Sequence, residues 1–195
     1  MRLFLAIDIP DEIYKTRLLN ELIADIGRIP SKIHAPEKMH ITLAFLDEVD
    51  EASTPHLVEI LKKVTGPKFN LKLAGVGVFD SIKQPHVIFI GTSNPPELTR
   101  LAETTRGALE GDAFFFDPKP FRPHVTIARI KDIHWHEFKE RKRYTKEQQK
   151  ILRDIIDRYE HQEFGSFTVD HFSLIASAPT EHGHVYSELA QFPLA

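Results

Sequence analysis

The sequence predicts an α+β fold with antiparallel sheets, and three observations favour this class. Strand-like and helical segments alternate irregularly along the 195 residues, and several strand–turn–strand pairs lie between the helices. In addition, one short strand motif occurs twice, about half the chain length apart. The repeat predicts an internal duplication with two similar lobes. Since neither a low-complexity segment nor a linker separates the halves, we expect residues 1–195 to form one two-lobed domain with a cleft between the lobes.

Hydrophobic periodicity defines the elements of the N-terminal half. Short apolar runs predict buried strands, whereas apolar residues that recur every three or four positions predict helices. Prolines mark two boundaries, since Pro10 ends the first strand and Pro36 lies in a turn before the second. The expected elements are, in order, a strand at 2–9, a helix at 11–26, a strand within 33–45, a helix at 51–64, and strands at 69–79 and 86–90.

The C-terminal half follows the same rules. Pro95 and Pro96 suit the first turn of a helix, and the strongly charged segment 132–144 indicates a surface connection. A loop through Pro179 and Gly183 is expected to join the last two strands. The expected elements are, in order, a helix at 95–109, a strand at 121–130, a helix at 146–159, and strands at 164–176 and 185–192.

The repeated motif is a histidine, an apolar spacer, a threonine and a second apolar residue. It occurs as His40-Ile41-Thr42-Leu43 and as His124-Val125-Thr126-Ile127. Because side chains alternate across a strand, each histidine shares one face with its threonine, and the spacers point to a core on the other face. One such motif carries little information. Two copies with matching spacers indicate two imidazoles and two hydroxyls that converge on one substrate.

Two imidazoles across a cleft provide a general base and a general acid near neutral pH. Two hydroxyls beside them donate hydrogen bonds to anionic oxygens without changing the charge of the site. This set suits in-line displacement at phosphorus, in which one histidine takes a proton from the attacking oxygen and the other protonates the leaving oxygen. The reaction needs no metal if acid and base are both in place, so we expect no metal and no cofactor.

The composition is that of an ordinary globular protein, with 42% hydrophobic and 27% charged residues. A net charge of −3 argues against a protein that coats nucleic acid, although one RNA end can still bind in a small positive cleft. The absence of cysteine excludes disulfides, thiolate metal sites and a cysteine nucleophile. We expect a cytoplasmic protein, because the apolar run at 3–7 is too short for a leader peptide and no window is long enough for a membrane helix.

Beyond the two motifs, nearly the whole chain resembles the two-histidine phosphoesterases. The resemblance is to the bacterial and archaeal RNA 2′,3′-cyclic phosphodiesterases in particular, which were historically called 2′-5′ RNA ligases. The matching segments keep their order and spacing. They are residues 1–7, 36–46, 75–79, 121–129 and 164–170, and residues 183–194 around Tyr186.

The resemblance implies a bilobal, pseudo-twofold fold of two antiparallel sheets around a central cleft, with helices on the outside. It also implies hydrolysis of the 2′,3′-cyclic phosphate end of RNA to a 2′-phosphate, with water attacking phosphorus and the ribose 3′-oxygen leaving, and reversible joining of 2′-5′ linkages. His40 and His124 are the implied acid–base pair, and we take His40 as the base and His124 as the acid. Thr42, Thr126 and Arg129 are implied to hold the phosphate.

The implied substrates are RNA ends, such as those of tRNA fragments, or nucleotide cyclic phosphates, and no membrane or obligate protein partner is expected. Small cyclic phosphates such as ADP-ribose cyclic phosphate, 2′-5′ oligonucleotides, and a non-catalytic module that binds RNA ends are the alternatives. A metal-dependent hydrolase is a further one. However, His134-Trp135-His136 and His182-Gly183-His184 lack a carboxylate partner at diagnostic spacing.

Several positions depart from the simple pattern. Arg129 follows His124 by an odd number of residues, so a regular strand aims it away from the cleft and only a bulge, a twist or the end of the strand brings it back. The equivalent residue in the first motif is Phe45. Asp47 and Ile33 stand where the family often has a glycine and an aromatic residue.

The candidates for stacking on a base are Phe114, Phe115 and Phe116, and those for a basic surface are Lys38, Lys119, Arg122 and the run 139–150.

Overall fold

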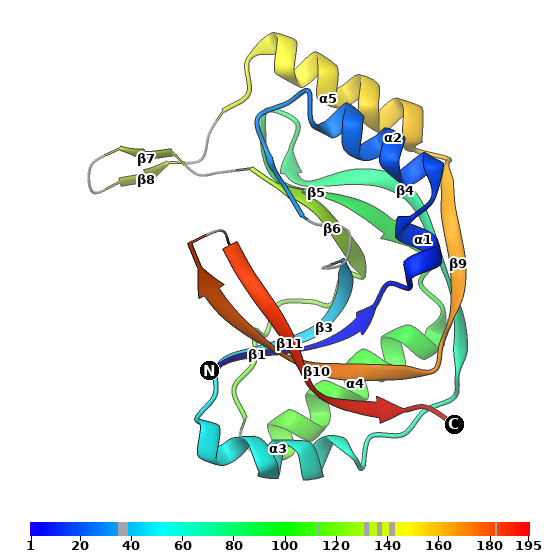
Figure 1. Ribbon diagram of the computed structural model, residues 1–195, viewed down its shortest axis with the longest axis vertical. Coiled ribbons are helices and arrows are strands. Elements are labelled where there is room, and N and C mark those ends of the chain that lie inside the picture. The colour runs from blue at the N-terminus through cyan, green and yellow to red at the C-terminus, as the bar shows by residue number, and fades with distance from the viewer. Residues whose placement is uncertain (35–38, 113, 131–132, 136–137, 141–142, 182) are drawn as a thin grey trace.

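The computed structural model describes residues 1–34, 39–112, 114–130, 133–135, 138–140, 143–181 and 183–195 (Figure 1). It confirms the α+β class, with helices outside a curled antiparallel sheet. None of the described helices is long and apolar enough to cross a membrane. The helices are α1 (Asp11–Tyr14), α2 (Arg17–Ile26), the 3-10 turn η2 (Glu51–Ser53), α3 (Thr54–Leu61), α4 (Pro96–Gly111) and α5 (Lys146–Tyr159). The strands are β1 (Arg2–Asp8), β2 (Lys32–Ile33), β3 (His40–Glu48), β4 (Phe69–Ser81), β5 (Gln84–Thr92), β6 (His124–Arg129), β7 (Ile133–Trp135), β8 (Phe138–Glu140), β9 (Glu163–Val169), β10 (His171–Thr180) and β11 (Gly183–Pro193).

The two motif strands lie side by side at the centre of the main sheet. In the described part of the chain this sheet has nine strands, in the order β11-β10-β1-β3-β6-β5-β4-β9, with β2 beside β6. Among those residues, β3 and β6 pair through Ile41 opposite Val125. The two expected sheets are therefore two half-sheets joined at this pair. The first half-sheet is β11-β10-β1-β3, the second is β6-β5-β4-β9, and Figure 1 shows how strongly they curl together.

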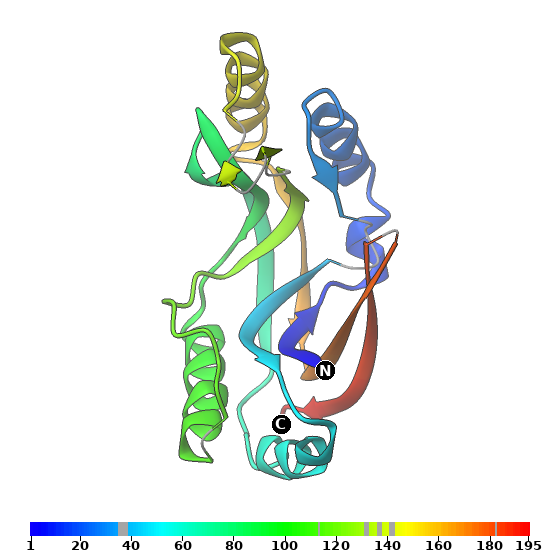
Figure 2. The same cartoon turned by 90° about the vertical axis from the view of Figure 1, so that its left-hand side faces the viewer.

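Two helix pairs cover the outside of the sheet. α2 packs against α5 and α3 packs against α4, at opposite ends of the molecule (Figure 1; Figure 2). α5 also contacts β4 of the second half-sheet, and α4 contacts β3 of the first. The helices bury Leu22, Leu57, Leu101 and Leu152 in one core cluster with the motif spacer Ile41. The apolar side of the motif strands therefore faces the helices, which leaves their polar side for the opposite face.

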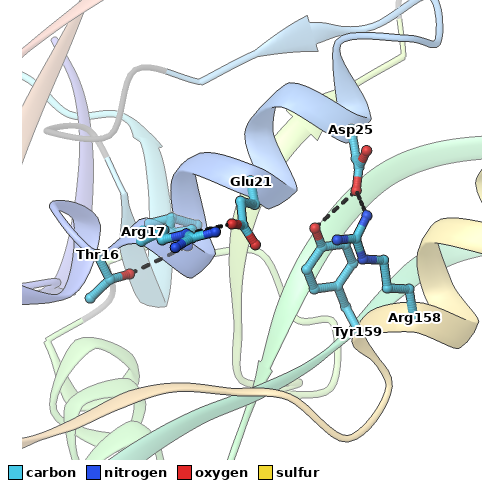
Figure 3. A network of polar contacts seen from close by, with 7 residues as sticks. Thr16, Arg17, Glu21, Asp25, Arg158 and Tyr159 are labelled. Carbon is cyan, nitrogen blue, oxygen red and sulfur yellow. Dashed lines mark hydrogen bonds and ion pairs between the residues drawn. The ribbon is translucent and has the colours of Figure 1, made fainter.

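A polar contact ties α2 to α5. Asp25 of α2 accepts a hydrogen bond from the Tyr159 hydroxyl at 2.9 Å and forms an ion pair with Nη1 of Arg158 at 3.0 Å (Figure 3). Burial and the contact with Asp25 raise the pKa of Tyr159 to about 12. The hydroxyl therefore remains a donor at neutral pH and fixes the two helices against each other.

Four segments differ from the sequence-based expectation. The helix expected at 11–26 is interrupted, because the Thr16 side chain caps a new helix by accepting a hydrogen bond from the Leu19 amide. The strand expected at 164–176 is two strands separated at Asp170, of which β9 pairs with β4 and β10 pairs with β1. The charged connection at 132–144 contains the hairpin β7–β8. Pro179 and Gly183, expected in a loop, lie in β10 and β11, because these strands stay paired up to Thr180 and Gly183.

Candidate active site

The five residues that the sequence nominates line one cavity of about 550 Å³. His40 and Thr42 reach it from β3, and His124, Thr126 and Arg129 reach it from β6. The histidines and threonines are half-buried, whereas Arg129 is exposed. The cavity lies where the two half-sheets meet, so the fold brings the two motifs to one place.

The register at the centre of the sheet sets how the motifs face each other. Ile41 lies opposite Val125 in an antiparallel pair. This register places each histidine across from the threonine of the other motif. The spacers are all buried, with exposed fractions of 1% or less for Ile41, Leu43, Val125 and Ile127. The motif strands thus have a polar face on the cavity and an apolar face in the core.

A β-bulge brings Arg129 to the cavity. The pairing of β6 with β5 has a register shift at which β6 contributes one extra residue. Ile127 and Ala128 are consequently both buried, and Arg129 returns to the face of His124. β3 likewise contributes one extra residue, Leu43, to its pairing with β1. This bulge turns Phe45 toward the cavity. The parity problem in the sequence is therefore resolved by a bulge that occurs in both motif strands.

His124 is held by a neighbouring carbonyl and by two aromatic rings. Its Nδ1 lies 2.7 Å from the carbonyl oxygen of Arg122. Because a carbonyl only accepts, Nδ1 carries the proton of the neutral ring and Nε2 is the proton acceptor. The ring centre of Phe79 lies 4.7 Å from the imidazole and that of Phe89 lies 5.7 Å away, both edge-on. Burial lowers the pKa of His124 and the charge of Arg129 lowers it further, against the opposing effect of the carbonyl.

His40 is packed between two aromatic rings of the first half-sheet. The ring centre of Phe4 lies 4.8 Å away, and that of Tyr186 lies 5.5 Å away in an edge-on contact. Phe4 comes from β1 and Tyr186 from β11, so strands from both ends of the chain fix this imidazole. Burial raises the pKa of Tyr186, which keeps its hydroxyl protonated near neutral pH.

The cavity is more basic than the molecule as a whole. Its charged lining residues are Arg106, Lys119, Arg122 and Arg129 against Asp80 and Asp117, whereas the net charge of the chain is −3. Lys119 and Asp117 form an ion pair at 2.8 Å, and the lysine lowers the pKa of that carboxyl. The surplus positive charge resides on arginines, whose planar groups suit a phosphate.

Other candidates from the sequence do not line this cavity in the described structure. Residues 114–116 are absent from its wall, and Ile33 packs against the core. Lys38, His136 and His182 lie outside the described residues, as do the side chains of 139–142. Within the part of the chain that is described, no group of three or more His, Asp or Glu side chains is arranged to hold a metal ion.

The cavity also has lining residues that the sequence did not indicate. They include His34, His86, Phe121 and Arg106. His34 follows β2, and the pairing of β2 with β6 brings it to the site. Such long-range contacts leave no local periodic signal, and Arg106 lies on a helix whose pattern indicates only its buried side.

The comparison with known proteins agrees with this arrangement. A family profile described as the AKAP7 2′5′ RNA ligase-like domain matches residues 4–194. The chain belongs to this family. Its membership in the 2′5′ RNA ligase-like family confirms the resemblance inferred from segments along nearly the whole sequence.

Relatives in the 2′5′ RNA ligase-like family match over nearly the whole chain. A protein of Archaeoglobus fulgidus named RNA 2′,3′-cyclic phosphodiesterase is 34% identical over 194 residues, which cover 98% of this chain and 99% of that protein. A protein of the same name from Aquifex aeolicus is 32% identical over 190 residues, which cover 93% of this chain and 94% of that protein. A crystal structure of a Thermus thermophilus protein has a TM-score of 0.75 and 26% identity, covering 99% of this chain and 97% of that one.

Proposed function

We propose that this chain is an enzyme that hydrolyses the 2′,3′-cyclic phosphate end of RNA to a 2′-phosphate without a metal ion. The observation that carries the proposal is the convergence of both His-x-Thr motifs, from separate half-sheets, on one basic cavity. The names of the relatives from Archaeoglobus fulgidus and Aquifex aeolicus support the same reaction. RNA ends in the cytoplasm, including those of tRNA fragments, are the proposed substrates.

The two histidines divide the proton transfers. His124 is the proposed base, because its lowered pKa leaves it neutral at pH 7 and its Nδ1–H is already committed to a carbonyl. It takes a proton from water as the water oxygen attacks phosphorus. The bond from phosphorus to the ribose 3′-oxygen breaks, and His40 gives that oxygen a proton. This assignment reverses the one made from the sequence, because the hydrogen bond from Nδ1 of His124 to the Arg122 carbonyl leaves Nε2 of His124 free to accept a proton.

Thr42, Thr126 and Arg129 are the proposed phosphate ligands. The threonine hydroxyls donate to the non-bridging oxygens, and the register places one on each side of the strand junction. Arg129 adds a fixed positive charge where charge accumulates as phosphorus becomes five-coordinate. The three groups act on the transition state more than on the ground state, so their loss is expected to lower kcat.

The test is hydrolysis of a short RNA that ends in a 2′,3′-cyclic phosphate, in excess chelator. The wild type is expected to release a 2′-phosphate, and His40→Ala and His124→Ala are each expected to lose at least about 100-fold in kcat, the usual contribution of a general acid or base. His161→Ala, an exposed histidine outside the cavity, is the control and should keep full activity.

Three other outcomes contradict parts of the proposal. A 3′-phosphate product would show that the ribose 2′-oxygen, and not the 3′-oxygen, is the leaving group. Loss of activity with chelator would contradict the metal-free mechanism. Absence of turnover by the folded wild type would contradict the RNA-end hydrolase itself. The same assay would then be repeated with small cyclic phosphates and 2′-5′ oligonucleotides.

A further inference from the structure

Arg106 on α4 makes contacts that no step of the proposed mechanism uses. Its Nε donates to the carbonyl oxygen of Leu43 at 3.0 Å, and its Nη1 donates to the carbonyl oxygen of Lys119 at 2.8 Å. Its Cζ lies 5.7 Å from the ring centres of both Phe116 and Phe121. The side chain is half-buried and borders the cavity. A guanidinium with two donors on the backbone and its flat face on aromatic rings is held in one orientation.

The first of these carbonyls belongs to the first motif. Leu43 directly follows Thr42, at the bulge where the pairing of β3 with β1 is shifted. A bulge interrupts the regular hydrogen bonds of the ladder. The hydrogen bond from Arg106 therefore fixes the backbone at an irregular point, next to Thr42 and three residues after His40.

The second carbonyl belongs to the loop that leads into the second motif. Lys119 lies three residues before Arg122, and the carbonyl of Arg122 is the group that holds Nδ1 of His124 at 2.7 Å. Phe121, whose ring lies near the guanidinium, is part of the same loop and of the cavity wall. Arg106 therefore contacts both the backbone next to His40 and the loop whose Arg122 carbonyl holds His124.

We propose that Arg106 is a positioning residue that links the two motifs and keeps His40 and His124 at the separation that acid–base catalysis requires. The inference rests on the proposed function for its catalytic consequence. In the described residues the ladder between β3 and β6 has one residue pair, Ile41 with Val125, so the backbone pairing between the motif strands is short. Arg106 supplies a second connection from outside the sheet.

Lysine cannot take over this role. It keeps the charge, but its ammonium group does not present two donors in a fixed fork and does not stack on the rings in the same way. A residue that acts on the substrate only through its charge, by contrast, is replaced by lysine with modest loss. Arg106→Lys therefore separates positioning from direct binding of the phosphate.

The first test compares the wild type with Arg106→Lys and Arg106→Ala in hydrolysis of the cyclic-phosphate RNA. We expect kcat to fall about tenfold to a hundredfold in both variants, because a displacement of about 1 Å at a reacting group has an effect of this size. KM is expected to change much less, and millimolar guanidinium ion should restore part of the kcat of Arg106→Ala. Arg100→Ala, an exposed position on the same helix, is the control and should behave as the wild type.

Two results of this assay overturn the proposal. A lysine variant with nearly wild-type kcat would show that only the charge matters. A raised KM with unchanged kcat would make Arg106 a substrate-binding residue instead. Thermal unfolding of each variant checks that a loss of kcat does not come from loss of the fold.

A second measurement needs no turnover. Inorganic phosphate is titrated into the protein while the imidazole resonances of His40 and His124 are followed by NMR. Both should respond with one dissociation constant in the wild type and lose this common response in Arg106→Lys. A common response that persists in the variant overturns the positioning role. Loss of the common response together with a wild type inactive on RNA would overturn the proposed function and leave the positioning role standing.

Discussion

At the scale of single residues, Arg129 contributes to the pKa of His124. Its positive charge is one of the causes that lower the pKa of that histidine, after burial. If His124 is the base, the acid side of the profile of kcat/KM against pH reports the pKa of this residue in the free enzyme. A change at Arg129 should therefore be visible as a change in pH dependence as well as in rate.

Arg129→Gln is expected to move the acid limb of the pH profile of kcat/KM to higher pH. Loss of the positive charge raises the pKa of His124, so a larger fraction of the base is protonated at pH 6. The plateau should also fall, by about 100-fold, because a group that stabilises the transition state is lost. The measurement is kcat/KM from pH 5 to pH 9 in both proteins.

Arg129→Lys is the matched control, because it keeps the charge and loses the planar fork. Its acid limb should stay at the position of the wild type even if its plateau is lower. An unmoved limb in Arg129→Gln would mean that His124 is not the base, or that Arg129 does not act on it.

Residues of the site divide into those that local patterns can reveal and those that they cannot. His40, Thr42, His124 and Thr126 follow from strand alternation and repetition alone, and the structure places all four on the cavity. Arg106 reaches the cavity only because α4 packs on β3. That packing depends on the tertiary fold, so no spacing in the sequence indicates it.

Asp47 stands at a position where the sequence resemblance leads us to expect a glycine. Its φ is 58°, in the left-handed region that glycine enters freely. Aspartate is among the residues that tolerate this region best. The backbone of the β3 end is therefore compatible with either residue, and Asp47 does not line the cavity.

At the scale of secondary-structure elements, the contact between α2 and α5 depends on a buried hydroxyl. Tyr159 is 1% exposed and donates to Asp25 at 2.9 Å. Tyr159→Phe should lower the free energy of unfolding by about 1.5 kcal/mol, the usual value for a hydrogen bond to a charged group. Urea unfolding followed by circular dichroism measures the change.

Tyr14→Phe provides the comparison. Tyr14 of α1 is half-buried, but its hydroxyl donates to Asp11 in an exposed hydrogen bond, where water can replace the lost partner. We expect a change below about 0.5 kcal/mol, as for most surface substitutions. A loss in Tyr159→Phe as small as the one expected for Tyr14→Phe would indicate that the Asp25–Arg158 ion pair, and not the tyrosine hydroxyl, holds α2 against α5.

The elements themselves were predictable to different degrees. The helix expected at 146–159 has those bounds in the structure, because periodicity coincides with a capping box formed by Thr145 and Gln148. The break at Asp170 was missed, since the apolar pattern continues on both sides. It exists because β9 and β10 pair with different half-sheets, which a local pattern does not show.

At the scale of the whole molecule, the order of elements repeats. If the short elements α1, β2, η2, β7 and β8 are set aside, β1, α2, β3, α3 and β4 are followed by β5, α4, β6, α5 and β9, in the same sequence of strand, helix, motif strand, helix and strand, and β10 and β11 follow the second series. Each outer helix pair takes one helix from each series, α2 with α5 and α3 with α4 (Figure 1). We propose on this basis that residues 1–195 form one two-lobed domain that arose by internal duplication.

The charge distribution of the molecule predicts contact with the end of an RNA only. The chain is acidic overall, and its cavity holds the surplus of arginine. A plot of the logarithm of the association constant for cyclic-phosphate RNA against the logarithm of salt concentration should have a slope of about −1.4. This slope corresponds to contacts with two phosphates of a single strand. Lengthening the RNA from about 4 to about 20 nucleotides should therefore add little affinity.

Arg122→Gln tests whether Arg122 binds one of the RNA phosphates. It should reduce the magnitude of the salt slope by about 0.7, since one phosphate contact is lost. Lys62→Gln, at the end of α3 and away from the cavity, should leave the slope unchanged. A slope that steepens with RNA length would show that a wider surface binds the chain of phosphates.

The first half-sheet combines strands that are far apart in the sequence, and this affects how the protein folds during synthesis. β1 precedes β10 and β11 by most of the chain, yet one of its edges is covered by β10 and the His40 ring is packed by Tyr186 of β11. Until those last strands emerge, the nascent chain carries a strand edge with open hydrogen-bonding groups, which invites wrong pairing. The first half-sheet is therefore complete only after β10 and β11 have been synthesised.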